Sequence, residues 1–143
     1  MDIGIVERFL NKVDKDFPVP ISCKQDLVLY ARKLVEKATV CGEYQNEELI
    51  SMVAGYTDNL ENNLAYISIV ATAPEGRGQG FATKLVKEFI SICKDKHISA
   101  VHLYTDIRNQ PAIKMYDKIG FVTYEMQDEP RPDDVHLIYY IEK

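Results

Sequence analysis

The sequence predicts one domain of the mixed α/β class, with a mostly antiparallel central sheet, one parallel strand pair and helices on both faces. A chain of 143 residues has the usual length of one domain, so residues 1–143 are assigned to it. The predicted elements run in the order α-α-β-β-β-α-β-α-β-β. A β-α-β crossover joins parallel strands, so the pair flanking the third helix should be parallel. Short connections should make the early strands antiparallel.

Two amphipathic helices are predicted at the start of the chain. Apolar residues recur at spacings of three and four over residues 2–14, at Ile3, Val6, Phe9, Leu10 and Val13. Two prolines then exclude a helix interior over residues 17–21 and favour an extended loop. Ser22, with Gln25 three residues later, is expected to cap a second helix. The apolar face of that helix would comprise Leu27, Tyr30, Ala31, Leu34 and Val35.

Three strands are predicted next, at residues 39–44, 49–56 and 64–71. A polar turn at residues 45–48 separates the first two, and a polar loop at residues 58–63 precedes the third. The third run is almost entirely apolar, which is typical of a strand in the middle of a sheet.

The second half of the chain continues with a helix that begins after Gly80. Its apolar face would comprise Ala82, Leu85, Val86, Phe89, Ile92 and Cys93. A strand at residues 101–105 and a short helix at residues 110–119 follow. Two last strands are predicted at residues 121–126 and 136–141, separated by an acidic, proline-bearing loop at residues 127–134.

Composition excludes several classes of function. The net charge of −5 argues against nucleic-acid binding, which needs a basic surface, and fits a cationic substrate. Cys23, Cys41 and Cys93 are odd in number and widely spaced, and the three histidines are scattered, so neither a disulfide framework nor a metal site is expected. The first residues do not form a signal peptide, and no apolar run is long enough to span a membrane. A cytoplasmic protein without membrane partners is therefore expected.

A glycine-rich turn stands between the third predicted strand and the following helix. Its sequence is Arg77-Gly78-Gln79-Gly80-Phe81-Ala82. Glycines let the backbone approach a ligand closely, and the N-terminus of a helix attracts anions, so this arrangement is typical of a pyrophosphate site. It is not a Walker sequence, because no Gly-Lys-Ser/Thr ends it, and Thr83 stands where a dinucleotide motif has its third glycine. A plain strand-to-helix turn is the alternative interpretation.

A second set of residues lies on the short helix at residues 110–119. Asn109, Ala112 and Tyr116 are spaced i, i+3 and i+7, so they project from one face with a small residue between two polar ones. Asn109 is expected to cap this helix, and Gly120 suits the left-handed position that ends it. The alternative for Tyr116 is a half-buried tyrosine of the core.

Together the two motifs resemble the GNAT superfamily of acyl-CoA-dependent N-acetyltransferases. The cofactor motif Gln/Arg-x-x-Gly-x-Gly/Ala of that family is matched by residues 77–82. Its later motif, Asn-x-x-Ala-x-x-x-Tyr-x-x-x-Gly-Phe, is matched at every fixed position from Asn109 to Phe121. The resemblance is strong over residues 64–121 and extends to the whole chain in the order of its elements.

The resemblance implies acetyl-CoA as co-substrate, no metal, and a role for each matched position. The strand that ends with Val70, Ala71 and Thr72 would carry a bulge whose backbone binds the acetyl carbonyl and the pantetheine amides. Asn109 would contact the pantetheine arm, and Tyr116 would lie near the thioester sulfur as the general acid. Backbone N–H groups would hold the pyrophosphate, at Arg77, Gly78, Gln79, Gly80, Phe81, Ala82 and Thr83.

The chemistry also requires a base, because an amine with a lysine-like pKa is almost entirely protonated at pH 7. Glu43, Tyr66 and Asp106 are candidates, but for each of them a solvated or structural side chain is the favoured interpretation. Family members that acetylate ribosomal-protein N-termini often have a glutamate where this chain has Tyr104, which counts against a peptide acceptor.

Three further positions bear on the site. Gly76 replaces a common aromatic residue, which would loosen the loop, and Thr72 replaces a common valine. Residues 17–20 would form a wall of the acceptor site or a rigid connector.

The function expected from the sequence is acetyl transfer to the amine of a small molecule, such as an amino sugar, polyamine, amino acid or antibiotic. A protein lysine or N-terminal acetyltransferase and a non-catalytic acyl-CoA-sensing domain are the alternatives. The sequence does not decide the acceptor, the natural acyl group or the oligomeric state, and it leaves a homodimer open. The acceptor would be bound by the loop at residues 17–21, the strand ends and the loop at residues 127–134.

Overall fold

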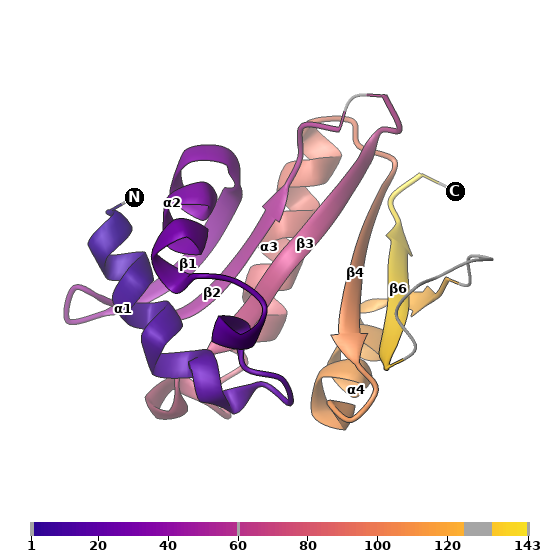
Figure 1. Cartoon of the computed structure of the whole chain (residues 1–143). Helices are drawn as coiled ribbons and strands as arrows, with labels where there is room; N and C mark the ends of the chain where they lie inside the picture. Colours follow the sequence, from indigo (N-terminus) through magenta and orange to yellow (C-terminus); the bar gives the residue numbers. More distant parts are fainter. Residues whose placement is uncertain (1, 60, 125–132, 143) are drawn as a thin grey trace.

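One twisted sheet forms the middle layer of the computed structural model, which describes residues 2–59, 61–124 and 133–142 (Figure 1). Within these residues, six strands have the order β1-β2-β3-β4-β6-β5. The strands are β1 (Thr39–Gln45), β2 (Glu48–Tyr56), β3 (Leu64–Thr72), β4 (Ala100–Asp106), β5 (Val122–Thr123) and β6 (Asp134–Tyr140). The helices are α1 (Ile3–Val13), α2 (Leu27–Lys37), α3 (Phe81–Asp95) and α4 (Gln110–Ile119).

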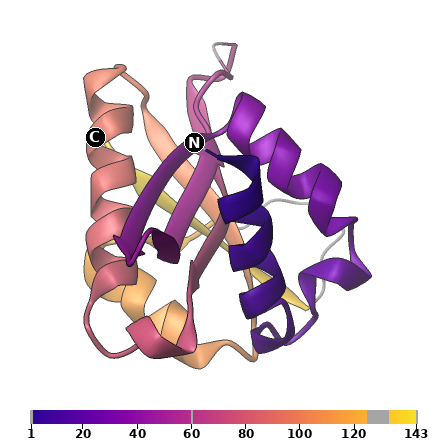
Figure 2. The ribbon, with the colours of Figure 1, turned by 90° about the vertical axis from the view of Figure 1, so that its left-hand side faces the viewer.

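Helices cover both faces of the sheet and enclose two separate cores (Figure 2). On one face, α1 and α2 bury Phe9, Leu10 and Leu34 against β2 and β3. On the other face, α3 and α4 bury Phe89 and Tyr116 against the sheet. These are the apolar stripes that the spacing predicts. Over the described residues, none of the helices has both the length and the apolar character needed to cross a membrane.

The pairing of the strands confirms the predicted mixed class. β1 with β2, β2 with β3, β4 with β6 and β5 with β6 are antiparallel. β3 and β4 are parallel, as expected for strands joined through the crossover helix α3. Among the described strands, this is the single parallel pair, and it lies in the middle of the sheet.

The ends of some elements differ from the prediction. Ser22 does not cap α2, because it lies in a 3₁₀ turn at Ile21–Cys23. Asp26 caps the helix instead, and its carboxylate accepts hydrogen bonds from the N–H groups of Val28 and Leu29. The strand expected at residues 121–126 is limited to Val122–Thr123 within the described residues, since Tyr124 is already outside it. The rest of that strand and most of the loop at residues 127–134 lie outside the described residues.

A bulge in β3 changes which side chains face each core. The pairing shifts between Ala54, opposite Ile69, and Gly55, opposite Ile67, so Ser68 is the extra residue. Ile67 packs on the α3 side, whereas Ser68 bonds to Tyr30 of α2 and Ile69 packs on that same side. Two consecutive side chains therefore point one way, as at other bulges. The strand carries its bulge, as the resemblance implies.

Gly55 makes the β3 bulge possible, because the bulge leaves no room for a side chain at residue 55. A Cβ at this position would lie 2.4 Å from the carbonyl oxygen of Tyr66 and 2.7 Å from Cζ of Phe89. We expect Gly55→Ala to lower the free energy of unfolding by about 1–3 kcal/mol, the usual cost of overpacking. Urea unfolding followed by circular dichroism measures this change.

Gly4→Ala is the matched control for Gly55→Ala. Gly4 lies in α1, where its Cβ would meet only the Asp2 carboxylate at 3.1 Å and the flexible end of Arg8. Alanine should be neutral or stabilising there by about 0.5–1 kcal/mol, because glycine is unfavourable inside a helix. Equal stability of the two variants would contradict a tight contact at Gly55.

Candidate functional site

A cleft opens where β3 and β4 separate. The two strands pair only from Leu64 opposite Ala100 to Tyr66 opposite His102, yet β3 continues to Thr72 and β4 to Asp106. The space between them is part of a cleft of about 770 Å³. Beyond Tyr66, the β4 side of β3 has no partner strand among the described residues, so its backbone groups face the opening.

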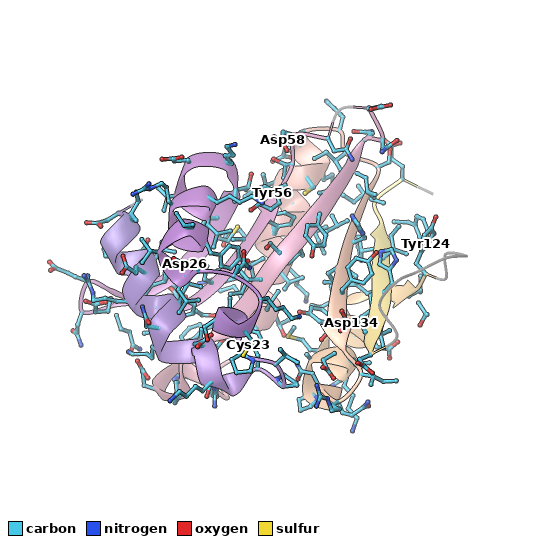
Figure 3. The ribbon with its side chains drawn as sticks, in the orientation of Figure 1. Cys23, Asp26, Tyr56, Asp58, Tyr124 and Asp134 are labelled. Carbon is cyan, nitrogen blue, oxygen red and sulfur yellow. The ribbon has the colours of Figure 1, made fainter. Side chains whose placement is uncertain are left out.

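Residues from both halves of the chain line this cleft. Cys23 and Asp134, which belong to segments on opposite sides of it, are labelled in Figure 3. One end of the cleft is formed by the predicted donor-site residues Val70, Ala71, Thr72, Arg77, Ala82, Asn109 and Tyr116. Aromatic and apolar side chains line the rest of it: Phe17, Pro18 and Val19, whose segment is called the aromatic wall below, and Tyr30, Tyr66 and Tyr104. Five other predicted residues follow Arg77 on the adjoining surface turn and the first turn of α3, at Gly78, Gln79, Gly80, Phe81 and Thr83.

The glycine turn presents a row of unused backbone donors. Gly78 and Gly80 have φ angles of 78° and 80°, the left-handed region that favours glycine. Among the described residues, no acceptor is found for the backbone N–H groups of residues 78–83. Arg77 differs from its neighbours, because its N–H already donates to the Pro74 carbonyl at 3.3 Å. The turn and the first turn of α3 therefore have the geometry of an anion site, which starts at Gly78.

The segment before this turn is closely packed. A Cβ on Gly76 would lie 3.1 Å from Cγ2 of Thr72, so the absence of an aromatic residue does not loosen the loop, contrary to the expectation. The Thr72 hydroxyl is 2.8 Å from the hydroxyl of Ser51 on β2. Ser51 also donates to the Ala71 carbonyl at 3.2 Å. The polar side chain that replaces valine is thereby satisfied inside the sheet.

The aromatic wall is attached to both α1 and the donor end of the cleft. The carboxylate of Asp14 accepts hydrogen bonds from the N–H and the hydroxyl of Ser22, at 2.8 and 2.6 Å. These bonds close the ends of the segment at residues 17–21 and lower the pKa of Asp14. On the side of the glycine turn, the Arg77 guanidinium binds Asp16 at 2.6 Å and the Thr72 carbonyl at 3.3 Å. The wall is therefore a fixed part of the cleft.

Helix α4 presents the predicted polar face to the cleft. Asn109, Ala112 and Tyr116 all line it, as their spacing predicts. Asn109 occupies the N-cap position, but its side chain makes no capping hydrogen bond, so the amide remains available for a ligand. Tyr116 is only 5% exposed and packs edge-on against Phe121. Burial raises the pKa of the Tyr116 phenol, which keeps it protonated at neutral pH.

The three base candidates have different environments. Glu43 is on the edge strand β1, paired with Lys84 of α3 at 2.8 Å, and does not line the cleft. Asp106 lines it but is held by the Arg108 guanidinium at 2.6 and 2.9 Å and by the Arg108 N–H at 2.9 Å. These hydrogen bonds lower the pKa of Asp106 to about 2, which makes it a weak base. Tyr66 lines the cleft on the β3 side.

The structure also brings together two histidines that the sequence leaves apart. Nδ1 of His102 on β4 lies 2.8 Å from Nε2 of His136 on β6. His102 alternates with buried residues of β4, whereas His136 is itself buried in β6, so no alternation in the sequence marks the pair. In the part of the chain that the structure describes, no group of three or more His, Cys, Asp or Glu side chains has the arrangement of a metal site.

Comparison with known proteins gives the same family for most of the chain. A sequence model of the acetyltransferase (GNAT) family matches residues 6–121. A 60-residue stretch is 35% identical to N-alpha-acetyltransferase 30 of Schizosaccharomyces pombe, covering 42% of this chain and 40% of that protein. A mycothiol acetyltransferase of Pseudarthrobacter chlorophenolicus is 37% identical over 60 residues, covering 42% of this chain and 19% of that protein. The chain thus matches less than half the length of either relative.

Solved structures share the fold. The PaiA N-acetyltransferase from Thermoplasma acidophilum, solved in complex with coenzyme A, superposes with a TM-score of 0.76. The superposition covers 97% of this chain and 92% of that one, at 16% sequence identity. The same arrangement of strands and helices is therefore reached with few shared residues.

The environment of Asp106 can be tested by removing its partner. We expect Arg108→Gln to raise the pKa of Asp106 from about 2 toward the ordinary value of about 3.9. A lowered pKa stabilises the folded protein at pH values above the pKa of Asp106 in the unfolded chain. This stabilisation is lost as the pH falls toward about 2. The variant should therefore lose stability at pH 6 but match the parent near pH 2. Carboxyl ¹³C shifts against pH give the pKa.

Arg8→Gln is the control for Arg108→Gln, since Arg8 forms an exposed pair with Glu48 at 3.2 Å. This change should leave the titration of Asp106 unaltered. An Asp106 that titrates near its ordinary pKa in the parent protein would show that the Arg108 pairing does not hold in solution.

Proposed function

Because the chain belongs to the acetyltransferase (GNAT) family, we propose that it transfers an acetyl group from acetyl-coenzyme A to the amine of a small molecule. One observation carries the proposal. A single cleft joins an unpaired edge of β3, the face of α4 with Tyr116 and an aromatic wall, and it adjoins the row of unused N–H donors at residues 78–83. A thioester donor and an amine acceptor could meet there.

The donor end fits a nucleotide thiol ester. The N–H groups of residues 78–83 would bind its pyrophosphate, since they converge at the N-terminus of α3, where the helix dipole favours negative charge. A Cβ on Gly78 or Gly80 would meet nothing within 4 Å, so the turn is open toward such a ligand. The β3 edge at Val70, Ala71 and Thr72 and the Asn109 amide would bind the pantetheine arm. Acetyl-coenzyme A would supply the activated acetyl group.

Tyr116 would stabilise the departing sulfur. A buried phenol with a raised pKa remains protonated, so it can donate a hydrogen bond to a developing thiolate. Because a thiol is normally a stronger acid than a phenol, complete proton transfer from Tyr116 is uphill. Its role is therefore a hydrogen bond that strengthens as charge builds on the sulfur, and the proton lost by the amine is available to neutralise the thiolate.

The acceptor end suits a compact amine with an apolar or aromatic body. Phe17, Pro18 and Val19 line the same cleft as Tyr66 and Tyr104, and ring faces attract a cationic amine. The wall is attached to α1 and the donor turn through Asp14 and Asp16, which limits the size of the acceptor. Tyr104 also stands where peptide-acetylating members carry a glutamate. These features favour a small molecule over a protein terminus.

A thiol-release assay with acetyl-coenzyme A tests the proposal. The acceptor panel contains arylalkylamines, polyamines, amino sugars, amino acids and short peptides. We expect turnover on small amines, with arylalkylamines preferred. Turnover on peptides alone would favour a protein acetyltransferase. Thermal stabilisation by acetyl-coenzyme A without turnover on any acceptor would favour a sensor domain.

The role of Tyr116 predicts a specific kinetic defect. Tyr116→Phe should lower kcat by about 10²-fold, within the usual range for a group that assists proton chemistry, while the KM for acetyl-coenzyme A changes little. Tyr44→Phe is the control, because Tyr44 is an exposed tyrosine on the edge strand β1. Unchanged turnover in Tyr116→Phe would remove Tyr116 from the mechanism.

The role proposed for the aromatic wall predicts a change in the KM for the acceptor, in contrast to the change in kcat expected for Tyr116→Phe. Phe17→Ala should raise the KM for the acceptor by about tenfold or more, since a buried phenylalanine contact is worth roughly 1.5–3 kcal/mol. The KM for acetyl-coenzyme A should stay within about twofold. An unaltered acceptor KM would indicate that residues 17–20 serve only as a connector.

A further inference from the structure

A pair of hydroxyl groups lines the cleft on the α2 side of the sheet. The Tyr30 phenol of α2 and the Ser68 hydroxyl of β3 lie 2.5 Å apart, and both residues line the cleft. Tyr30 is only 4% exposed and packs in the core between α2 and the sheet, whereas Ser68 is partly exposed. Among the described residues, this hydrogen bond is the one partner that either hydroxyl has.

The β3 bulge places Ser68 between the residues assigned to the donor and those assigned to the acceptor. Tyr66 comes two residues before it and Val70 two residues after it, and both line the cleft. At about 3.3 Å per residue, Ser68 is about 6–7 Å from each along the strand. In the proposed reaction the amine meets the thioester between these positions. A ligand group bound by Ser68 is therefore close to the reacting nitrogen.

The pair can bind a group that both donates and accepts a hydrogen bond. Two hydroxyls have two protons, and their mutual bond uses one of them, whichever oxygen is the donor. The second proton and the remaining lone pairs are available to a ligand in the cleft. Burial raises the pKa of the Tyr30 phenol, and the Ser68 hydrogen bond only partly opposes this, so the phenol stays neutral at physiological pH.

A charged group fits this position less well. An ammonium has no lone pair, so it would leave the spare hydroxyl proton without an acceptor. A carboxylate would lose hydration and needs a fixed cation nearby. The cations among the described lining residues are Arg77, which is paired with Asp16, and Lys24, which is exposed. A neutral hydroxyl satisfies both the spare proton and the lone pairs.

We propose that the Tyr30–Ser68 pair binds a hydroxyl next to the acceptor amine, so that the preferred acceptor is a 1,2-amino alcohol with an aromatic body. This inference rests on the proposed acetyl transfer, and it makes Tyr30 and Ser68 specificity-determining residues. The aromatic body follows from the rings and apolar side chains that line the same cleft, and the short distance from nitrogen to hydroxyl follows from the place of Ser68 on β3.

The two enantiomers of 2-amino-1-phenylethanol test this inference. The carbon that bears the hydroxyl is a stereocentre, so only one enantiomer can direct its hydroxyl to the pair while its ring and its nitrogen keep their places. Both enantiomers have the same pKa and the same apolar surface. We expect their kcat/KM values in the parent protein to differ by about 3- to 10-fold, the effect of one neutral hydrogen bond.

Ser68→Ala should reduce this ratio to under about twofold, by a loss on the preferred enantiomer. The kcat/KM for 2-phenylethylamine, which lacks the hydroxyl, should stay within about twofold of the parent value. Tyr30→Phe keeps the ring in the core and leaves the Ser68 hydroxyl without its partner, so it should lower the ratio too. It is the second variant if Ser68→Ala does not fold.

Tyr56→Phe is the matched control. Tyr56 lies on β2 and packs against the same core as Tyr30 (Figure 3). Its hydroxyl is buried without a hydrogen-bond partner among the described residues, and the residue does not line the cleft. This variant removes a phenol oxygen from the same core, yet the ratio and all three kcat/KM values should match those of the parent.

The outcomes separate this inference from the proposed function. A parent protein that acetylates amines but treats the enantiomers alike, accepts neither of them, or prefers phenylalanine, which has a carboxylate in place of the hydroxyl group, overturns the inference and leaves the proposed function intact. An equal loss on all three amines in Ser68→Ala and Tyr30→Phe indicates a structural role and also overturns it. A parent protein inactive on every amine refutes the proposed function, and the inference with it.

Discussion

The separation of β3 from β4 beyond Tyr66 is the constraint on which the rest of the structure depends. A sheet is normally continuous, because an unpaired backbone N–H or C=O that is hidden from water costs free energy. Here the edge of β3 borders a cleft, where a ligand or water can satisfy those groups. Separate cores pack against the two faces of the sheet, and the one beneath α3 and α4 contacts both β3 and β4.

The same opening explains why the α1–α2 segment and the glycine turn act as one unit. Arg77 reaches from the turn to Asp16 beside the aromatic wall, and Lys12 of α1 binds Glu75 just before the turn. Such exposed pairs are individually weak and are screened by salt, so their value lies in position more than in stability. They hold the segment at residues 17–21 close to the glycine turn. In the proposed reaction, this would hold two bound molecules at a fixed separation.

Periodic elements could be predicted from the sequence, whereas features that depend on partners distant in sequence could not. The apolar spacing of α1 and the glycines at 78 and 80 are local signals, and the structure places both as expected. Ser22 looked like a helix cap, but its hydroxyl is used by Asp14, which leaves that role to Asp26. The bulge at Ser68 depends on Gly55 of the neighbouring strand, and the His102–His136 contact on the β4–β6 register, which no single segment reveals.

Protonation around the cleft is largely determined by packing. Arg108 keeps Asp106 ionised, and burial raises the pKa of both Tyr30 and Tyr116, so these phenols stay neutral. None of these three groups changes charge between pH 5 and 8, and a proton removed from an amine in that range must go elsewhere. The cleft can therefore keep its electrostatic framework fixed across this range.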